Sequence, residues 1–234
     1  MNIGIIPARG GSKRIPRKNI KLFAGKPIMA WVIETALQSG LFDRLIVSTD
    51  DEEVADVAVK YGAEVPFTRP AELSDDHTGI IEVVQHAIAW LTNEGGEIEN
   101  VCCMLATAPF LQAGVLRQGL TQLVDSNASY AFSVTDYPFP IQRAVRINPE
   151  GRVEAIWPEN TPKRSQDLEE AFHDAGQFYW GTRRAFEQGE AIFSSGSVPV
   201  RLPRYMVQDI DTPEDWKLAE LMFNALRDAG DLTS

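Results

Sequence analysis

A basic segment in the first 26 residues has the side chains and spacing expected of a site that binds a polyphosphate. No Asp or Glu precedes Glu34, and Gly10 and Gly11 come just after an apolar run at residues 3–6. Glycine lets the backbone turn sharply and point N–H groups into a concavity, and Arg and Lys add positive charge around it. The segment holds seven of the chain's 22 Lys and Arg, namely Arg9, Lys13, Arg14, Arg17, Lys18, Lys21 and Lys26. It therefore predicts a site for a small anionic ligand.

Three other interpretations of this segment compete with the anion site. A targeting peptide needs an apolar or amphipathic stretch after its charges, whereas here the apolar run comes first. A nucleic-acid-binding arm conflicts with the pI near 4.8, because the acidic remainder of the chain would repel a phosphate backbone. A solvated surface loop is the usual explanation of a charge run, but it leaves the two glycines after a buried strand unexplained. The anion site accounts for most of the features.

An acidic pair near the other end of the chain, Asp209 and Asp211, is a second candidate site. Residues two apart in an extended segment point to the same side, so both carboxylates could face one Mg²⁺, the hard cation that accompanies a triphosphate. A structural interpretation competes with this one. Asp211 could instead be the N-cap of a helix that starts at Pro213 and continues with Glu214 and Asp215. The two interpretations stay open at this point.

Several other kinds of site are not supported by the sequence. The order Gly10-Gly11-Ser12-Lys13 does not match a P-loop, and the dinucleotide fingerprint Gly-x-Gly-x-x-Gly is absent after the first predicted strand. The adjacent Cys102 and Cys103 are expected to be core thiols of a cytoplasmic protein, and the three His show no metal-ligand spacing. No apolar stretch approaches the ~20 residues of a membrane span. We therefore expect neither a membrane nor a nucleic acid as a partner.

The elements that must position these residues alternate between strand and helix. A length of 234 residues with 44% apolar and 24% charged side chains fits a single domain, residues 1–234. This pattern predicts an α/β fold with a doubly wound, mostly parallel sheet, in which ligands bind at the carboxyl ends of the strands. Strands are expected at residues 3–6, 44–49, 63–66, 101–106, 129–134 and 176–181, and helices at 27–38, about 50–60, 78–91, 113–124 and 213–227.

An excursion at about residues 136–175 interrupts this alternation. Prolines break the segment, and the apolar stretches 145–147 and 153–157 flank a turn, which predicts a small protruding hairpin. Apolar side chains on such an arm are often oligomer contacts, so we expect a homodimer. An ordinary edge hairpin remains an equally good interpretation of the pattern.

The segment from residue 6 to residue 19 resembles the signature of the CMP-sialic acid synthetase family, whose members activate nine-carbon acidic sugars as CMP conjugates. Further segments match the family in its own order, at residues 47–50, 69–73, 106–109 and 209–215. Three stretches look most like the pseudaminic acid cytidylyltransferase branch of that family, at residues 137–144, 164–167 and 173–180. The resemblance implies a Rossmann-like nucleotidyltransferase fold.

The same resemblance implies a reaction and the residues that carry it. The anomeric hydroxyl of the sugar would attack the α-phosphate of CTP and release pyrophosphate, with cations and N–H donors stabilising the charge on the phosphate oxygens. Arg9 and Lys18 would contact the triphosphate, while Asp209 and Asp211 would hold Mg²⁺, with Asp209 the better candidate to accept the hydroxyl proton. The backbone of the loop would cradle the phosphates, and two polar side chains would read the cytosine. These residues are Ala8, Gly10, Gly11 and Ser12 for the cradle, and Asn19 and Arg69 for the base.

Sugar recognition should involve a cation for the substrate carboxylate. By family position Arg164 is the first candidate and Arg143 the second. Hydroxyl and acetamido groups would be bound by Gln166, Asp174, Gln177 and Tyr179, although a plain surface or hairpin role is as good an interpretation for each. Many sialic acid enzymes have Gln where this chain has Leu105, which favours a sugar other than sialic acid.

The expected function is therefore that of a cytoplasmic, Mg²⁺-dependent homodimer that makes CMP-pseudaminic acid from CTP and the free nine-carbon sugar. Within the same class, legionaminic or sialic acid is the alternative substrate, and an octulosonate fits less well because of the motifs in the second half. Outside that class, the chain could be a non-catalytic nucleotide-binding module. The pair Asp209 and Asp211 argues against such a module, because binding alone needs no metal pair.

Overall fold

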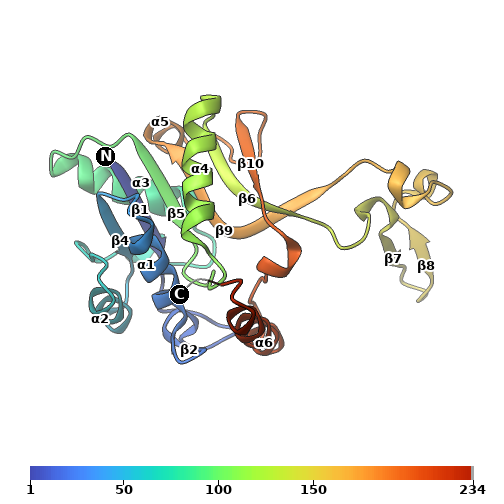
Figure 1. Cartoon of the computed structure of the whole chain (residues 1–234), viewed down its shortest axis with the longest axis horizontal. Coiled ribbons are helices and arrows are strands. Elements are labelled where there is room, and N and C mark those ends of the chain that lie inside the picture. The colour runs from blue at the N-terminus through green and yellow to red at the C-terminus, as the bar shows by residue number, and fades with distance from the viewer. Residues whose placement is uncertain (233–234) are drawn as a thin grey trace.

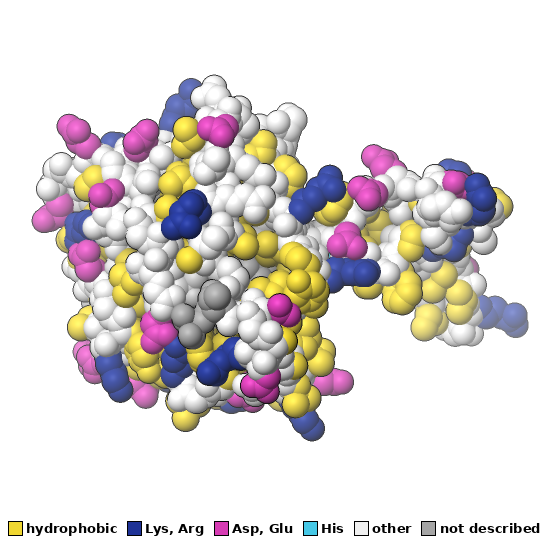
Figure 2. Space-filling view, in the orientation of Figure 1, with side chains coloured by type: hydrophobic (Ala, Val, Ile, Leu, Met, Phe, Trp, Pro, Cys, Tyr) yellow, Lys and Arg dark blue, Asp and Glu magenta, His cyan; other side chains and the backbone are white. Residues whose placement is uncertain are grey.

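The computed structural model describes residues 1–232 and shows a body built around a six-stranded sheet, from which a narrow arm projects (Figure 1). Figure 2 shows the same division at the surface. Across the sheet the strand order is β10-β6-β9-β5-β1-β4. Their bounds are Asn2–Pro7 for β1, Arg44–Ser48 for β4, Asn100–Met104 for β5, Tyr130–Asp136 for β6, Phe172–Thr182 for β9 and Ser197–Arg201 for β10. β1 pairs in parallel with β4 and β5, and β6 with β10, whereas β9 is antiparallel to both neighbours.

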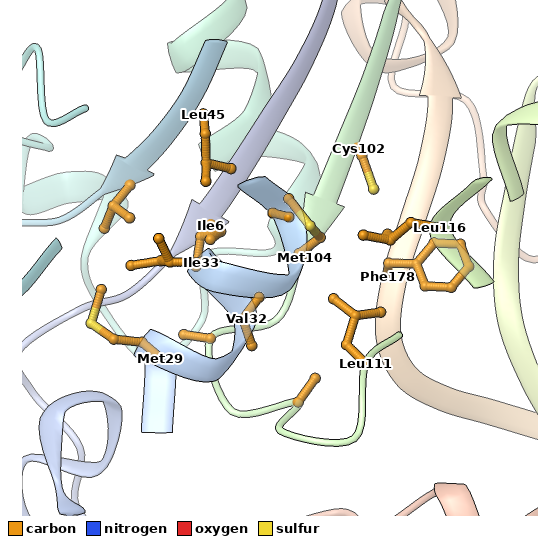
Figure 3. Packing of buried hydrophobic residues seen from close by; sticks show 14 of the residues in the cluster. Ile6, Met29, Val32, Ile33, Leu45, Cys102, Met104, Leu111, Leu116 and Phe178 are labelled. Carbon is orange, nitrogen blue, oxygen red and sulfur yellow. The ribbon is translucent and has the colours of Figure 1, made fainter. Parts of the chain in front are cut away.

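Helices cover both faces of this sheet. On one face lie α1 (Ile28–Ser39), α2 (Glu52–Lys60) and α4 (Ala113–Ser126), and on the other α3 (Ile80–Asn93) and α5 (Arg183–Glu187). On the face covered by α1, α2 and α4, Val32 of α1 packs with Ile6 and Met104 of the strands (Figure 3). Cys102 points to this face of the sheet and Cys103 to the other, and both thiols are free. The predicted doubly wound α/β fold is confirmed.

Local sequence explains where several of these helices begin and end. α1 ends at Gly40, whose φ of 65° lies in the left-handed region that glycine adopts without strain. α2 begins after Asp51, whose carboxylate accepts the backbone N–H of Val54. The last helix, α6 (Pro213–Ala229), begins with proline after the N-cap Thr212. Among residues 1–232, no helix is both long and apolar enough to cross a membrane.

A third hydrophobic cluster joins the two ends of the chain. Ile15 of the basic segment and Phe23 of the small hairpin formed by β2 (Leu22–Phe23) and β3 (Lys26–Pro27) pack against Trp216 of α6. The rings of Phe23 and Trp216 meet edge to face, with centroids 5.5 Å apart. Because α6 directly follows residues 209–211, this cluster brings the acidic pair beside the basic segment.

Two elements differ from the expectation. Residues 63–66 form no strand; they contribute a single bridge between Glu64 and Ile46, and Pro66 has no N–H with which to extend a ladder. β9 begins at Phe172, four residues earlier than expected, and is the antiparallel strand of the sheet. Short 3-10 helices of the body lie at Lys18–Ile20, Ala71–Leu73 and Arg204–Met206.

The arm is formed by residues 137–171, between the ends of β6 and β9, where Asp136 pairs with Phe172 (Figure 1). It contains the expected hairpin, in which β7 (Val145–Ile147) pairs antiparallel with β8 (Val153–Ala155). Three short 3-10 helices complete it, at Ile141–Arg143, Pro158–Asn160 and Ser165–Asp167. The three main hydrophobic clusters contain no buried residue of the arm.

Candidate active site

Six of the residues assigned to the nucleotide or the metal line one cavity of about 520 Å³. The six are Arg9, Ser12, Lys18, Asn19, Arg69 and Asp211. The cavity lies beyond the carboxyl end of β1, from which the chain passes first to β4 on one side and later to β5 on the other. Ligands of doubly wound folds bind at such a switch point. Ala8, Gly10 and Gly11 belong to the same loop but are not part of the cavity wall.

Gly10 is required by a close approach and not by an unusual backbone angle. A Cβ at this position would lie 2.5 Å from the Asp51 carboxylate, so any larger residue would push the loop away from α2. The N–H of Gly10 donates to Asp50 Oδ1 at 3.0 Å. A Cβ at Gly11, in contrast, would have no atom within 4 Å. The sequence predicted a nest of free N–H groups; here the N–H of Gly10 is already used to hold the loop against Asp50.

Arg17 fastens the end of the loop to the start of α2. Its φ of 55° lies in the left-handed region, and its guanidinium donates to both oxygens of Asp51, at 2.5 and 2.8 Å. The hydrogen bond from Arg17 lowers the pKa of Asp51 to about 2, and the capping N–H of Val54 acts in the same direction. The guanidinium of Arg17 is therefore used in contacts within the protein, and its pair with Asp51 fixes the position of the adjacent Lys18.

Of the acidic pair, Asp211 lines the cavity and pairs with the loop, whereas Asp209 is not part of the cavity wall. Asp211 accepts from Arg14 at 2.7 Å and from Lys18 at 3.4 Å. Asp209 is an exposed residue, yet its pKa is raised, by desolvation of the carboxyl group first and by the charge of Asp211 second. Because the charge of Asp211 raises the pKa of Asp209, a cation placed between the two carboxylates would be stabilised. Within residues 1–232, no group of three or more His, Cys, Asp or Glu could hold a metal ion.

The N-cap of α6 is Thr212 and not Asp211. Thr212 Oγ1 accepts the N–H of Asp215, and Asp215 Oδ2 accepts the N–H of Thr212 at 2.7 Å, which is a capping box. Asp215 Oδ2 also accepts the N–H of Asp211 at 3.1 Å. The helix start is thus satisfied without the Asp211 side chain, which points to the cations of the loop instead.

Arg69 is a buried cation with unused donors. Its side chain is only 4% exposed, and Nη2 lies 3.8 Å from Asp50. Nε and Nη2 have no hydrogen-bond partner among the described residues, and burial lowers the pKa of the guanidinium. A buried donor without an acceptor is costly, so a ligand that offers carbonyl or ring-nitrogen acceptors at this wall of the cavity would be stabilised. The other predicted base-reading residue, Asn19, donates to the carbonyl of Arg9 at 2.9 Å.

Three of the predicted sugar-binding residues lie on β9. The hydroxyl of Tyr179 donates to the carboxylate of Asp174, and burial followed by this hydrogen bond raises the pKa of Tyr179. The charge of Asp209 contributes to the same shift. Gln177 is buried and donates to the carbonyl of Met206 at 2.7 Å. None of the three lines the cavity.

The other three, Arg143, Arg164 and Gln166, lie on the arm. Arg143 donates to Ser165 Oγ at 3.2 Å and to the carbonyl of Lys163, and Arg164 pairs with Asp167 at 2.9 Å. These contacts organise the arm locally. The structure does not bring these side chains to the cavity of their own chain, since the arm projects away from the body (Figure 1).

Part of the cavity wall was not recognised from the sequence. Lys13 was recognised as basic but given no role, and Asp75, Asp76 and Thr78 were expected only in a loop or at a helix start. The segment Ser-Asp-Asp-His-Thr-Gly just ahead of α3 is the signal that could have found them, because acidic and hydroxyl side chains gather there before a helix start.

The chain is similar to known cytidylyltransferases. The family model described as cytidylyltransferase matches residues 3–180. The chain is 45% identical over 222 residues to pseudaminic acid cytidylyltransferase from Campylobacter jejuni, covering 95% of this chain and 96% of that protein. It is 30% identical to CMP-N,N'-diacetyllegionaminic acid synthase from Legionella pneumophila, with 97% and 98% covered.

The solved structures extend the agreement to the fold. CMP:2-keto-3-deoxy-manno-octonic acid synthetase, solved in complex with CTP, superposes with a TM-score of 0.69 at 17% identity, covering 96% of this chain and 98% of that one. At this identity the likeness concerns the fold alone. The family model spans most of the chain and the relatives cover nearly all of it. The chain belongs to the cytidylyltransferase family.

Proposed function

We propose that this protein transfers CMP from CTP to the anomeric hydroxyl of pseudaminic acid and releases pyrophosphate. The observation that carries the reaction is the cavity in which the cations of the basic loop, the unpaired donors of Arg69 and the carboxylate of Asp211 meet. The sugar is supported by the relative that is 45% identical over nearly the whole of both chains. Legionaminic acid is the second candidate, because the 30% identical relative is named for it.

In this proposal the loop binds the phosphates of the nucleotide and Arg69 binds its base. Lys18 and Arg9 bind the triphosphate, and the buried Arg69, helped by Asn19, binds the acceptor edge of cytosine. Negative charge accumulates on phosphate oxygens during the transfer, so fixed cations in a partly buried site stabilise the transition state. The clamp between Arg17 and Asp51 keeps Lys18 in place before substrate arrives.

Asp209 and Asp211 are the proposed Mg²⁺ ligands. The donor set fits, because both are carboxylates, Asp211 lies on the wall of an anion site, and desolvation together with the charge of Asp211 raises the pKa of Asp209. The bound cation would neutralise charge on the phosphates. Asp211 already attracts Arg14 and Lys18, so positive charge is stabilised at this position. Asp209, whose pKa is raised, is the proposed acceptor of the hydroxyl proton.

The sugar would lie between the acidic pair and β9. Asp174 and Tyr179 present hydrogen-bonding groups there. An apolar groove of about 480 Å³ adjoins the nucleotide cavity, shares Gly79 and Ile80 with it, and includes Phe193. Such a groove suits the apolar parts of N-acyl substituents. The proposed sugar is thus held by polar groups on one side and an apolar wall on the other.

We also propose that the protein is a homodimer formed through the arm. Hydrophobic side chains gather on the arm, at Phe139, Val145, Ile147 and Val153 (Figure 2). Phe139 is 80% and Ile147 75% exposed, although each would be stabilised by burial. A second copy that covered them would also receive the arm's cations Arg143 and Arg164, which could then bind the sugar carboxylate.

The two free, buried cysteines support the proposed cytoplasmic location.

The test is to incubate the purified protein with CTP, Mg²⁺ and, separately, pseudaminic, legionaminic and sialic acids, and to measure pyrophosphate release. We expect the largest kcat/KM with pseudaminic acid. A preference for legionaminic or sialic acid would refute the substrate and leave the reaction class intact. No release with any of the three sugars would favour the non-catalytic nucleotide-binding module.

A further inference from the structure

Another part of the cavity wall carries a carboxylate without an assigned role. Asp76 accepts from Arg9 Nη1 at 2.7 Å and pairs with the ammonium of Lys13. The same Arg9 nitrogen donates to the carbonyl of Asp75 at 2.8 Å. The side chain of Arg9 is therefore bound to residues 75 and 76 in this structure, although Arg9 is the cation proposed to bind the triphosphate.

The segment that carries Asp76 is held in place by its neighbours. Asp75 Oδ1 accepts the N–H of His77 at 2.9 Å, and from Thr78 it accepts both the N–H and the hydroxyl, each at 2.7 Å. These bonds lower the pKa of Asp75 to about 2, so its carboxylate keeps its charge at neutral pH. Asp76 is thus presented to the cavity from a fixed turn that ends at the start of α3.

Asp76 differs from the other acid that neutralises the loop. Asp51 holds Arg17 in a bidentate pair, caps α2 and packs against Gly10, so it cannot leave. Asp76 has no comparable structural role, because among residues 1–232 its carboxylate bonds only to the two cations, and its side chain is 35% exposed at the cavity rim. A carboxylate in this position presents to Arg9 and Lys13 the oxygen atoms that a phosphate would present.

We infer that Asp76 lowers the affinity of the site for phosphate groups by competing with them for Arg9 and Lys13. A ligand must displace the carboxylate before it gains these cations, so tight binding needs a further anchor, such as the base of a nucleoside triphosphate. Pyrophosphate, once cut from the nucleotide, has lost that anchor, and Asp76 replaces it on Arg9 and Lys13. Asp76 thereby weakens the binding of phosphate groups in general and speeds the release of the product. This inference rests on the proposed function, since it assumes that the cavity binds CTP.

The size of the effect follows from the exposure of the pairs. Ion pairs of this kind contribute little each because water and salt screen them. Removing the competing carboxylate should therefore tighten phosphate binding by about three- to tenfold and not by orders of magnitude. The effect should shrink as salt is raised, because screening weakens the contacts of both the carboxylate and the phosphate.

The experiment measures the affinities of inorganic pyrophosphate, CTP and cytidine by calorimetry, with and without Mg²⁺, for the wild type and three variants. Asp76→Asn removes the charge and keeps the shape, Asp76→Glu keeps the charge, and Glu72→Gln makes the same charge change on the neighbouring exposed helix. We expect Asp76→Asn to bind pyrophosphate and CTP about three- to tenfold more tightly, with cytidine unchanged. Product inhibition by pyrophosphate should strengthen by the same factor. Asp76→Glu and Glu72→Gln should resemble the wild type.

Other outcomes separate the possible failures. Equal or weaker pyrophosphate binding by a folded Asp76→Asn protein would overturn the inference, and Asp76→Ala gives the same readout if the amide variant does not fold. CTP binding that is weakened only in the presence of Mg²⁺ would make Asp76 a metal ligand, which also overturns it. A wild type that neither binds CTP nor releases pyrophosphate with any sugar would refute the proposed function itself. Normal turnover with unchanged affinities in Asp76→Asn would refute the competition alone.

Discussion

The basic loop and the arm both carry cations assigned to substrate, but the two regions are held in different ways. In the loop, Arg14 pairs with Asp211, which is 197 residues away in the sequence, and Arg17 pairs with Asp51, 34 residues away. The ion pairs within the arm are local: Arg164 meets Asp167 three residues on, and another pair joins the two strands of the hairpin. Ile15 anchors the loop in a hydrophobic cluster, whereas the arm adds no buried residue to any of the three.

This contrast teaches which part of the site one chain can complete. Long-range contacts from β4, α2 and α6 fix the loop, so one chain is enough to form the nucleotide end of the site. The arm is shaped by local contacts and exposes its apolar side chains, so its cations need another surface to act on. Catalytic groups work best when the surrounding shell holds them in place. We therefore expect changes in the body to affect chemistry and changes in the arm to affect assembly.

The largest expected effect is at Asp211. Asp211→Asn removes one of the two proposed Mg²⁺ ligands and the partner of Lys18, so kcat/KM should fall by about 10²–10³-fold. The melting temperature should change little, because Thr212 and Asp215 cap α6 without this side chain. Steady-state pyrophosphate release and thermal unfolding measure the two quantities.

A cap variant is the matched control for that change. Thr212→Ala should cost about 1 kcal/mol of stability, which corresponds to about 2–4 °C, while most of the activity remains. Normal activity in Asp211→Asn together with a lowered melting temperature would contradict the metal site and return Asp211 to a structural role.

The second effect concerns the arm. Ile147 and Val153 pair across the hairpin, so the double change to Glu places two charges on one apolar face. If that face is buried in the proposed dimer, the dissociation constant should rise by roughly a hundredfold, because buried unpaired charges are costly. Analytical ultracentrifugation across a dilution series measures it. The melting temperature of the body should stay close to that of the wild type at concentrations where both proteins are monomeric.

An apolar residue on the body provides the comparison. Val124 on α4 is also exposed, so Val124→Glu makes the same chemical change away from the arm and should leave the oligomeric state unaltered. A double-Glu arm variant that sedimented like the wild type would show that the arm is not the dimer contact.

The same contrast explains which features the sequence could predict. The ends of α1 and α2 depend on local signals, Gly40 and Asp51, and lie close to where they were expected. The cations of the loop were recognised because their motif is continuous in the sequence. Which acid neutralises each cation depends on residues dozens of positions away, so the contact of Asp76 with Arg9 was not foreseen.

The direction and pairing of the strands were also hard to predict from the sequence, because they too depend on residues far apart in the chain. Nothing local distinguishes β9, which runs antiparallel between β5 and β6, from the parallel strands around it. Its direction follows from the arm, since the chain leaves along β6 and returns beside it. The expected strand at residues 63–66 failed because Pro66 cannot donate to the ladder, although the apolar side chains there fit a strand.

The third effect concerns Arg69, the buried side chain of the body that is proposed to bind the base. Arg69→Lys keeps a positive charge but loses the planar fork of donors, so the KM for CTP should rise by about ten- to thirtyfold while kcat changes less. Discrimination between CTP and UTP should fall with it, and competition assays with UTP measure this. Arg44→Lys is the control, because Arg44 pairs with Glu64 outside the cavity. Unchanged discrimination in Arg69→Lys would assign the base to another residue.

The smallest expected effect concerns the clamp that makes the loop unlike the arm. Asp51→Asn keeps a good N-cap for α2 but removes the charge that holds Arg17, so the free energy of unfolding at pH 7 should fall by about 1 kcal/mol. The pKa of Asp51 is lowered in the folded protein to about 2 from 3.8. A lowered pKa stabilises the fold above the unfolded value, and this stabilisation is lost as the pH falls through the folded one. The difference in the free energy of unfolding between wild type and Asp51→Asn should thus be largest above about pH 5 and should disappear between about pH 4 and 2.

Asp51→Ala removes both the ion pair and the cap, so it should remain less stable than Asp51→Asn at every pH and should still differ from the wild type at about pH 2. Thermal unfolding of the three proteins from about pH 2 to pH 7 measures both differences. A wild-type advantage over Asp51→Asn that persisted unchanged at the acid end of this range could not come from the ionised carboxylate. The loop would then owe its position to the packing of Gly10 and Ile15, and its cations would be no better fixed by charge than those of the arm.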